Sequence, residues 1–336
     1  MENKEQESLR KILVIQTAFP GDVILATGLI ESLHNAFPQA SLDVLVRKGN
    51  EVLFEEHPYL SEILILDKKK GKLKAISAMA SLVRKKEYDL LINLHRFGSS
   101  GFIAMYSGAR RIVGFSKNPF SFAYTKRFPH ALDGRNETER NFLLIQDLKD
   151  VKYCKPKLYP SANHYKKVSA LFDLASKFVC IAPSSVWFTK ELPESKWMEL
   201  VNFFPPQIKI VFIGAPSDRN KCDRIIAANP HPNCINLAGK ISLIESAALM
   251  QQAQMVYAND SAPLHLATSV NAPSSAFFLS TVPKFGFTGL STKANVFECI
   301  QPLACRPCGL HGHRACPKGH FKCAIDLEIT REMATL

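Results

Sequence analysis

The sequence contains no uncharged hydrophobic run that approaches the ~18 residues of a membrane-spanning helix. Its amino-terminal stretch, MENKEQESLRK, is polar and charged, whereas a signal peptide needs a basic start followed by an apolar core. The chain also lacks the G-x-G-x-x-G pattern of dinucleotide-binding loops and the glycine spacing of Walker-type phosphate loops. These absences argue against a signal peptide, a membrane span, an NAD-dependent dehydrogenase and a simple nucleotide hydrolase. We expect a soluble, cytoplasmic protein.

The charge of the chain is strongly unbalanced. The formal net charge is +12 over 336 residues, and the basic excess is spread along the sequence rather than collected in a tail. Such an excess suits an anionic partner, for example nucleotide phosphates, a phosphorylated lipid or an acidic membrane surface. No nucleic-acid motif is present, and we expect no nucleic-acid partner.

Short apolar runs alternate with amphipathic segments along the whole chain, and 46% of the residues are hydrophobic. Strands with continuous apolar sequence that alternate with helices are typical of parallel sheets covered by helices, so the predicted fold class is α/β. The predicted strands are 11–16, 41–46, 62–66, 88–94, 109–115, 178–183, 209–214, 234–239, 254–260 and 274–279. The predicted helices are 23–36, 50–56, 72–86, 194–204, 217–228, 242–253 and 262–270.

The strand–loop–helix pattern begins again in the second half of the chain, where VCIAPSSVWFTK repeats the arrangement of ILVIQTAFPGD. We therefore predict two Rossmann-like domains, 1–160 and 161–336, joined near the proline-containing segment 155–165. Ligands of open α/β sheets bind at the carboxyl ends of the strands, so loops at that edge are candidate sites.

Asp22 follows the first strand in the segment TAFPGDVILAT. Aspartate is common at helix starts, where it accepts amide hydrogens, and this structural role is as well supported by the local sequence as a chemical one. Its place in the first loop at the ligand edge favours a catalytic base. We predict that Pro20 and Gly21 form a tight turn before the helix.

A phosphate site is predicted in the segment APSSVWFTKELPESKW, where hydroxyls and a lysine precede a helix. The candidates are Ser185, Thr189 and Lys190. The alternative is a capped loop with an exposed lysine.

Two further loops follow strands in the second half. In YANDSAPLHLA, a helix begins near Pro263, and its first amides are available to a diphosphate. In GAPSDR, Asp218 is a candidate for a ribose hydroxyl, and a capping role is equally consistent with the sequence. In YANDSAPLHLA the candidate diphosphate-binding residues are Asp260, Ser261, Ala262 and His265.

Nine cysteines are present, an odd number that suits reduced thiols in the cytosol. Near the carboxyl end, one C-x-x-C pair is followed by two more separated cysteines, with histidines between them. This spacing leaves open a structural zinc site, and the alternative is a loop whose thiols only pack. The possible zinc ligands are Cys305, Cys308, Cys316 and Cys323.

Taken in order, these segments resemble the ADP-heptose:lipopolysaccharide heptosyltransferases, glycosyltransferase family 9. FPGDVILATGLI, TKELPESKW and NDSAPLHLA carry the resemblance, and SGARRIVGF and NETERNFLLIQDL are similar to the family's N-terminal domain. CRPCGLHGHRACPKGHFKC resembles the heptosyltransferase II branch. The chain departs from the family where KELP replaces the usual KRWP and where Ala262 replaces a glycine.

The resemblance implies the GT-B architecture, two facing Rossmann-like domains with a central cleft. It also implies inverting transfer of a heptose from ADP-heptose to Kdo-lipid A or heptosyl-Kdo-lipid A, with no metal needed for catalysis. Asp22 would be the general base. Lys190, with Ser185 or Thr189, would bind the nucleotide phosphates, Asp218 the ribose, and the loop that contains Asp260 and His265 the diphosphate.

The acceptor is expected on the N-terminal domain, where basic side chains meet lipid phosphates or Kdo carboxylates. The predicted acceptor-binding residues are Arg96, Arg110 and Arg111. For Lys68–Lys70 a solvated basic surface is the favoured interpretation. The lipid acceptor leaves open a peripheral contact with the inner face of the inner membrane. Two rival functions remain: a GT-B transferase for another nucleotide sugar and glycan acceptor, and a non-catalytic nucleotide-sugar-binding protein.

Overall fold

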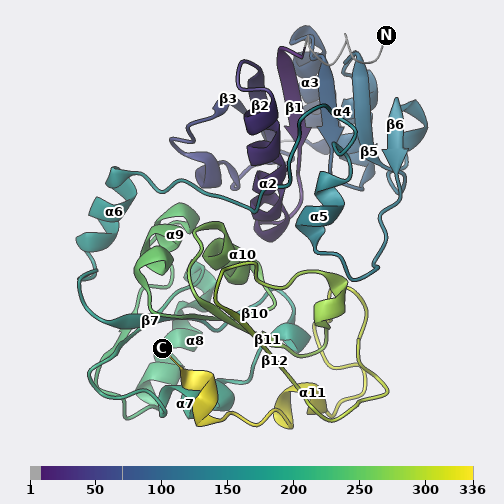
Figure 1. Cartoon of the computed structure of the whole chain (residues 1–336). Coiled ribbons are helices and arrows are strands. Elements are labelled where there is room, and N and C mark those ends of the chain that lie inside the picture. Colours follow the sequence, from purple (N-terminus) through teal and green to yellow (C-terminus); the bar gives the residue numbers. More distant parts are fainter. Residues whose placement is uncertain (1–8, 70, 336) are drawn as a thin grey trace. The chain divides into compact units, whose positions relative to one another are not determined.

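The computed structural model describes residues 9–69 and 71–335. Contacts divide the chain into two compact units, one that ends at Tyr159 and one that begins at Pro160 (Figure 1). The division lies within one residue of the expected domain boundary. Lys70 of the predicted basic cluster lies outside the described residues. No helix in the described part of the chain has the length and apolar character needed to cross a membrane.

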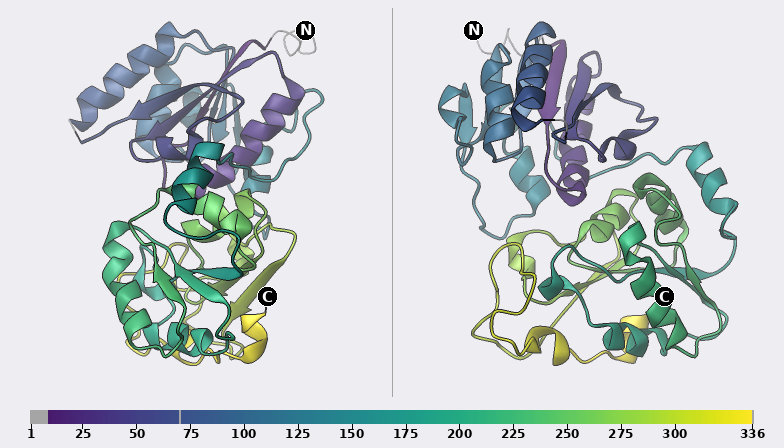
Figure 2. Two further views of the ribbon diagram at one scale, coloured as in Figure 1. Left: turned by 90° about the vertical axis from the view of Figure 1, so that its left-hand side faces the viewer. Right: turned by 180° about the vertical axis from the view of Figure 1, so that it is seen from behind.

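The first unit is a six-stranded parallel sheet in the order β3-β2-β1-β4-β5-β6. This is the strand order of a Rossmann fold. Helices α2 and α5 pack together, as do α3 and α4, and helices cover both faces of the sheet (Figures 1 and 2). The elements are β1 (Lys11–Ile15), α2 (Pro20–Ala36), β2 (Ser41–Arg47), β3 (Leu60–Leu66), α3 (Lys72–Lys85), β4 (Leu90–Asn93), α4 (Gly98–Tyr106), β5 (Arg111–Phe115), β6 (Lys126–Phe128) and α5 (Glu137–Phe142).

The segment that closes the first unit runs along α2. The backbone N–H of Cys154 donates to Ser32 Oγ at 3.1 Å, and that of Lys157 donates to Thr27 Oγ1 at 2.9 Å. A Cβ atom at Gly28 would lie 2.6 Å from the Cys154 carbonyl oxygen, so only glycine allows this approach. The expected linker therefore begins as a strap that is hydrogen-bonded to the first unit.

The second unit repeats the topology, with a parallel sheet in the order β12-β11-β10-β7-β8-β9. Read from β9, this is again the Rossmann order. The elements are α6 (Ala162–Ser169), β7 (Phe178–Ala182), α7 (Glu194–Val201), β8 (Lys209–Phe212), α8 (Arg219–Ala227), β9 (Cys234–Asn236), α9 (Leu243–Gln252), β10 (Val256–Asn259), α10 (Ala262–Ser269), β11 (Ser274–Phe278), β12 (Ala294–Glu298) and α11 (Lys322–Ile325).

The carboxyl-terminal residues belong to the core of the second unit. Phe321, Cys323 and Leu327 are buried in the same hydrophobic cluster as Trp197 and Phe277. Tyr257 Oη also donates to the backbone carbonyl of Thr335 at 3.0 Å. The cysteine-containing segment is thus held by packing on both sides.

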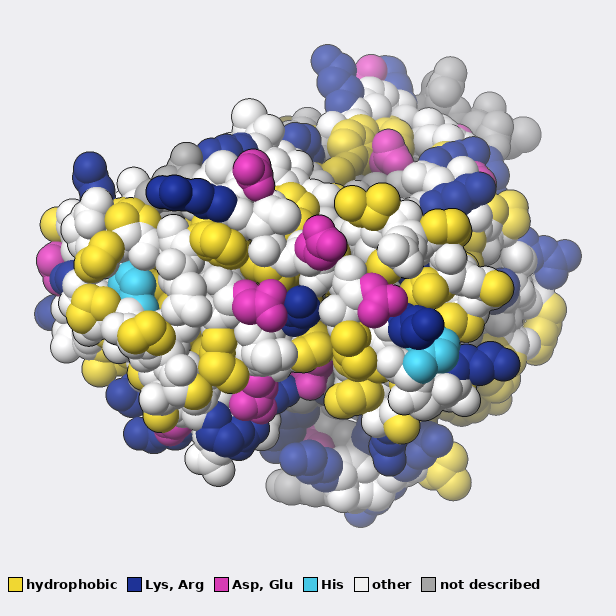
Figure 3. All heavy atoms as spheres, turned by 90° about the horizontal axis from the view of Figure 1, so that it is seen from below, with side chains coloured by type: hydrophobic (Ala, Val, Ile, Leu, Met, Phe, Trp, Pro, Cys, Tyr) yellow, Lys and Arg dark blue, Asp and Glu magenta, His cyan; other side chains and the backbone are white. Residues whose placement is uncertain are grey.

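Most predicted elements are present, but six were missed. Strands β6 and β12 are short or partly exposed, and helices α4, α5, α6 and α11 were not expected. The predicted helix 50–56 is a short 3₁₀ helix, η1 (Glu51–Phe54). On the face shown in Figure 3, lysine and arginine side chains lie among acidic and hydrophobic ones, in keeping with a diffuse basic excess.

Candidate functional site

Each sheet reverses its strand order at one point, and most of the predicted site residues follow the strands that meet there. In the first unit β1 and β4 are neighbours, and Thr17 Oγ1 lies 2.8 Å from His95 Nδ1, which joins the loops after these two strands. In the second unit β7 and β10 are neighbours. Parallel α/β sheets bind ligands at such switch points, so each unit offers a candidate site at its own switch point.

Asp22 lies in the first turn of α2, which begins at Pro20. The prediction of a turn at Pro20-Gly21 is wrong, because these residues are already helical; proline tolerates the first helical position, where its missing N–H has no acceptor. Phe19 is the N-cap and supplies no side-chain hydrogen bond. The Asp22 carboxylate interacts with the backbone N–H groups of Phe19 and Asp22, so the capping role weighed against catalysis is also present.

Asp22 is held in an environment that suits a base. Its pKa is raised from 3.8 to about 6, mainly by burial and then by the negative charge of Glu137, while the positive charge of Arg96 acts to lower it. A carboxylate with a pKa near 6 is ionised at neutral pH and is a stronger proton acceptor than an ordinary aspartate.

A positively charged cluster lies at the same edge of the first sheet. The pKa of His95 is lowered to about 4, mainly by burial and then by the positive charges of Lys68, Arg96 and Arg47, so all three cations act on one imidazole. Lys68 is half-buried and donates to Ser99 Oγ at 2.8 Å. The solvated-surface interpretation holds for the exposed Lys69 but is wrong for Lys68.

Arg110 and Arg111 do not belong to this cluster. Arg111 begins β5, so both residues lie at the amino end of a strand, opposite to the edge that carries Asp22 and Arg96. Arg110 pairs with Asp89 at 3.3 Å, and Arg111 pairs with Asp147 at 2.5 Å. Of the three predicted acceptor-binding arginines, the structure therefore brings only Arg96 to the switch point.

In the second unit, Lys190 and Asp260 form a salt bridge of 2.7 Å between the loop after β7 and the loop after β10. Thr281 Oγ1 donates to the same Asp260 oxygen at 2.7 Å. Both partners are largely buried, with side-chain exposures of 14% for Lys190 and 5% for Asp260. The carboxylate thus fixes the ammonium group beside the start of α10.

The start of α10 offers backbone donors. Ser261 is the N-cap but makes no side-chain cap; its hydroxyl donates to the Asn259 carbonyl at 3.3 Å. Pro263 lies in the first turn and has no N–H, which leaves the amides of Ser261 and Ala262 at the helix end. His265 lies one turn in and is buried. Amides at a helix start next to a lysine are a good environment for a diphosphate.

The loop that carries Lys190 is ordered by a residue that the sequence analysis left without a role. Glu191 accepts a hydrogen bond from the Ser185 amide at 2.7 Å and pairs with Lys221 at 2.7 Å. The glutamate of the KELP segment thus acts as a loop anchor. Ser185 Oγ accepts weakly from the Trp187 amide at 3.4 Å.

Thr189 is buried and holds the cysteine-containing segment. Its Oγ1 accepts from the His313 amide at 2.8 Å, and its own amide donates to the His313 carbonyl at 3.1 Å. A Cβ atom at Gly312 would lie 3.0 Å from Thr189 Oγ1 and from Lys190 Cγ. The Thr189 side chain is therefore engaged in structure, and its contact with a nucleotide stays a prediction.

Asp218 lies after β8, at the same edge of the second sheet. Its Oδ2 accepts from the Ala215 amide at 2.8 Å, across the 3₁₀ helix η4 (Pro216–Asp218). The structure thus shows the capping role, and the ribose contact stays a prediction.

Burial is the main cause that raises the pKa of the Cys323 thiol, and Cys308, Cys316 and Cys305 lie near enough to add to it; Cys305 Sγ lies 3.8 Å from His320 Nε2. Even so, within residues 9–69 and 71–335 no three His, Cys, Asp or Glu side chains are arranged to hold a metal ion. Cys323 is buried in the hydrophobic core. The packing alternative is thus observed for Cys323, and zinc stays a prediction.

Comparison with known proteins identifies the family. The model of "Glycosyltransferase family 9 (heptosyltransferase)" matches residues 76–314, more than half of the chain. The chain belongs to glycosyltransferase family 9. As a family member it is a glycosyltransferase, which sets aside the alternative of a non-catalytic binding protein.

Similar family members include the lipopolysaccharide core heptosyltransferase OpsX of Haemophilus influenzae, 24% identical over 87% of this chain and 86% of that protein. Lipopolysaccharide heptosyltransferase 2 of Escherichia coli K12 is 23% identical over 97% of both chains. The solved structure of E. coli ADP-heptose heptosyltransferase II covers 94% of this chain and 98% of its own, with a TM-score of 0.76 and 21% identity. The predicted GT-B fold class is confirmed.

Several residues that shape the family 9 site were missed in the sequence. Arg47 and His95 follow predicted strands, and this position could have drawn attention to them. Thr281 follows β11 in the same way. His130 and Glu137 follow no predicted strand. Glu137 lies in NETERNFLLIQDL, which was noted for its resemblance to the family but was given no role.

Proposed function

We propose that this family 9 enzyme transfers a heptose from ADP-heptose to the inner core of lipopolysaccharide, with Kdo-lipid A or heptosyl-Kdo-lipid A as acceptor. The names of the similar proteins support the sugar and the pathway. The observation that supports the chemistry is the Lys190–Asp260 salt bridge beside the start of α10, because a fixed cation next to backbone amides suits the charge of a leaving diphosphate.

In this mechanism the acceptor hydroxyl attacks the anomeric carbon from the face opposite to the nucleotide, which inverts the configuration. Asp22 accepts the hydroxyl proton as the new C–O bond forms, and its raised pKa makes it suited to that step. The C–O bond to the diphosphate breaks, and its electron pair leaves with ADP.

Negative charge grows on the diphosphate as the old bond breaks. Lys190, the amides of Ser261 and Ala262, and the dipole of α10 would stabilise that charge. A single preorganised donor of this kind typically contributes about 10²-fold in rate. These groups would neutralise the leaving group without a divalent ion.

The acceptor half of the reaction is assigned to the first unit. Arg47, Lys68 and Arg96 gather at the edge that carries Asp22 and suit the phosphates or carboxylates of an inner-core acceptor. A peripheral contact with the membrane would bring the enzyme to this lipid.

The test is a direct transfer assay. Purified protein is titrated with ADP-heptose, UDP-glucose and GDP-mannose by calorimetry, and transfer to Kdo-lipid A and to heptosyl-Kdo-lipid A is followed by mass spectrometry. We expect ADP-heptose to bind preferentially, and nuclear magnetic resonance of the product to show inversion. Transfer should persist in excess EDTA. Preferred binding and transfer of another nucleotide sugar would replace this proposal with the rival GT-B function.

A further inference from the structure

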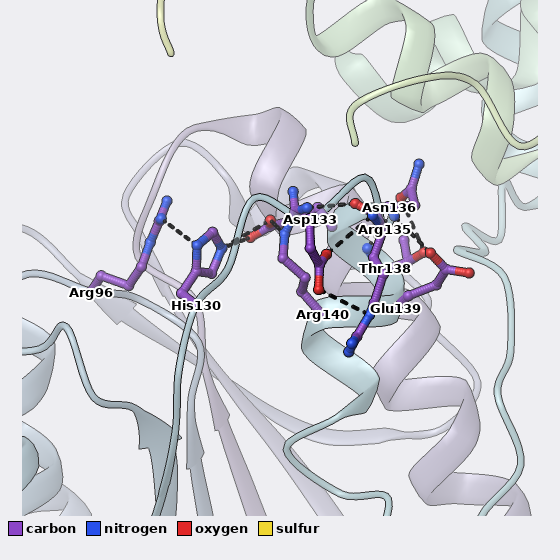
Figure 4. A network of polar contacts seen from close by, with 9 residues as sticks. Arg96, His130, Asp133, Arg135, Asn136, Thr138, Glu139 and Arg140 are labelled. Carbon is purple, nitrogen blue, oxygen red and sulfur yellow. Dashed lines mark hydrogen bonds and ion pairs between the residues drawn. The ribbon is translucent and has the colours of Figure 1, made fainter. Parts of the chain in front are cut away.

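A chain of buried polar contacts runs through the first unit from Arg96 to Arg140 (Figure 4). Arg96 Nη1 lies 3.0 Å from His130 Nδ1, and His130 Nε2 lies 3.2 and 3.1 Å from the two carboxylate oxygens of Glu137. Arg140 Nε donates to Glu137 Oε2 at 2.7 Å. His130, Glu137 and Arg140 are 6%, 4% and 1% exposed, whereas Arg96 is only partly buried.

The partners fix the protonation of His130. Arginine can only donate, so Nδ1 must accept from Arg96, and Nε2 must carry the hydrogen that faces the carboxylate. A doubly protonated ring would turn an N–H toward the guanidinium. His130 is therefore neutral in this arrangement, and its ring is held at both ends.

The inner end of the network is equally well fixed. Asn136 caps α5: its Oδ1 accepts from the Thr138 amide at 3.1 Å, and Glu139 accepts from the Asn136 amide at 2.7 Å. This places Glu137 at the first helical position and Arg140 one turn later. Arg140 Nη1 also donates to the Arg135 carbonyl at 2.5 Å. Burial acts to raise the pKa of Glu137, but its bonds with His130 and Arg140 outweigh this and keep the pKa below its ordinary value.

The network lies beside the proposed base, since α5 packs against α2. Two charged groups act on Asp22, with opposite signs: Glu137 from α5, and Arg96 from the loop after β4. Within the described parts of the chain, the contact with His130 is the single hydrogen bond of the Arg96 side chain. The remaining donors of the guanidinium are thus available to a ligand.

We propose that His130, Glu137 and Arg140 are positioning residues, which hold Arg96 beside Asp22 so that its remaining donors bind an anionic oxygen group of the acceptor. This inference rests on the proposed function, because it assigns the network to the acceptor of that reaction. Glu137 has a second effect: it places a fixed negative charge near the base, which Arg96 opposes.

The test compares five variants with the wild type, by the pH profile of kcat/KM for the acceptor and by the KM values. Glu137→Gln removes a negative charge near Asp22, so the acidic limb should move to lower pH by about 0.5–1 unit. Arg96→Gln removes a positive charge, so the limb should move to higher pH by a similar amount, and the acceptor KM should rise about tenfold. Damage to the fold alone would not shift the acidic limbs of these two variants in opposite directions.

His130 is tested by loss and rescue. His130→Phe keeps a ring but removes both contacts, and we expect the acceptor KM to rise about 5- to 20-fold while the donor KM stays unchanged. His130→Gln retains one acceptor and one donor and should restore at least half of the loss on a logarithmic scale. Glu31→Gln is the matched control: it removes another buried carboxylate of α2, about 13 Å along the helix from Asp22, and should leave the limb in place.

The outcomes separate the two proposals. If the wild type transfers no heptose to either acceptor, the proposed function fails. If the wild type is active but Arg96→Gln and Glu137→Gln keep its acidic limb and its acceptor KM, the positioning network is overturned. Should Glu137→Gln or His130→Phe not fold, Arg96→Gln decides alone, since an unchanged limb and KM would refute the proposal. A dephosphorylated acceptor shows which anion Arg96 binds. If Arg96 binds a carboxylate, Arg96→Gln still raises the KM for this acceptor; if it binds a phosphate, the variant and the wild type have the same KM.

Discussion

The two units share one strand order, yet they use charge at the switch point in opposite ways. In the second unit Lys190 and Asp260 neutralise each other at 2.7 Å, and Thr281 completes the contact. In the first unit Asp22 forms no ion pair with any described residue. Glu137 acts to raise its pKa and Arg96 acts to lower it. A general base needs a pKa near the working pH, whereas a site for a leaving diphosphate needs a cation already in place. The same fold supplies both because the loops, not the strands, carry the charges.

The largest effect should come from the first unit. Asp22→Asn keeps the size of the side chain but removes the proton acceptor, so we expect kcat to fall by about 10²- to 10⁴-fold. Affinity for ADP, measured by calorimetry, should not change. Wild-type turnover in this variant would show that another group takes the proton.

In the second unit, Lys190→Ala should act on the donor instead. We expect kcat/KM for the donor to fall about 10²-fold, with weaker ADP binding. The change also leaves Asp260 buried without its cation, so the free energy of unfolding in urea should fall by about 3 kcal/mol. Lys190→Ala combined with Asp260→Asn should recover stability but not ADP affinity; recovery of both would mean that the lysine only balances the aspartate.

The raised pKa of Asp22 predicts how activity and stability change with pH. Since the base must be ionised, kcat/KM should fall about tenfold for each pH unit below about 6. The folded state binds the proton more tightly than the unfolded state, so the stability that Asp22 contributes is full below about pH 4 and is lost as the pH rises through 6.

Asp22→Asn should therefore be more stable than the wild type by about 1–2 kcal/mol at pH 7.5, a value reduced because Asp22 keeps some solvent contact. Urea unfolding at pH 7.5 and pH 4 measures the gain, which should disappear at the lower pH. An equal gain at both pH values would mean that the charge of Asp22 is not the cause.

The smallest expected effect links the cysteine-containing segment with the donor side. Gly312 has a φ of +77°, and a Cβ atom there would press on Thr189 and Lys190. Gly312→Ala should lower stability by about 1 kcal/mol and weaken ADP binding a few-fold. Gly319→Ala is the matched control, since Gly319 has a φ of +72° with nothing within 4 Å: it should lose the same stability and keep its ADP affinity.

The sequence predicted the central strands well because each is a continuous apolar run buried on both faces. It missed β6 and β12 at the sheet edges. Strand β6, KRF, is charged and short, and β12 has a largely uncovered face. Edge strands carry such residues because they are half solvated, so the pattern that identifies a buried strand is absent.

The site was predictable where it follows a strand end and not elsewhere. Asp22 and Lys190 lie in the segments that follow predicted strands, and Asp260 ends one, so each lies at the carboxyl edge of its own sheet. Glu137 reaches Asp22 only because α5 packs on α2, and that contact joins segments far apart in sequence. Arg110 and Arg111 lie at the other edge for a related reason: their charge was visible in the sequence, but the direction of β5, which sets their edge, was not.

The two-bond clasp between Thr189 and His313 bears on how enzymes of this kind can be recombined. A hybrid enzyme could take the carboxyl-terminal segment from one parent and the loop between β7 and α7 from another. The two hydrogen bonds would then have to form between residues that come from different proteins. Crossovers placed so that both pieces come from the same parent, for example at the strap before Pro160, keep the lysine's support intact.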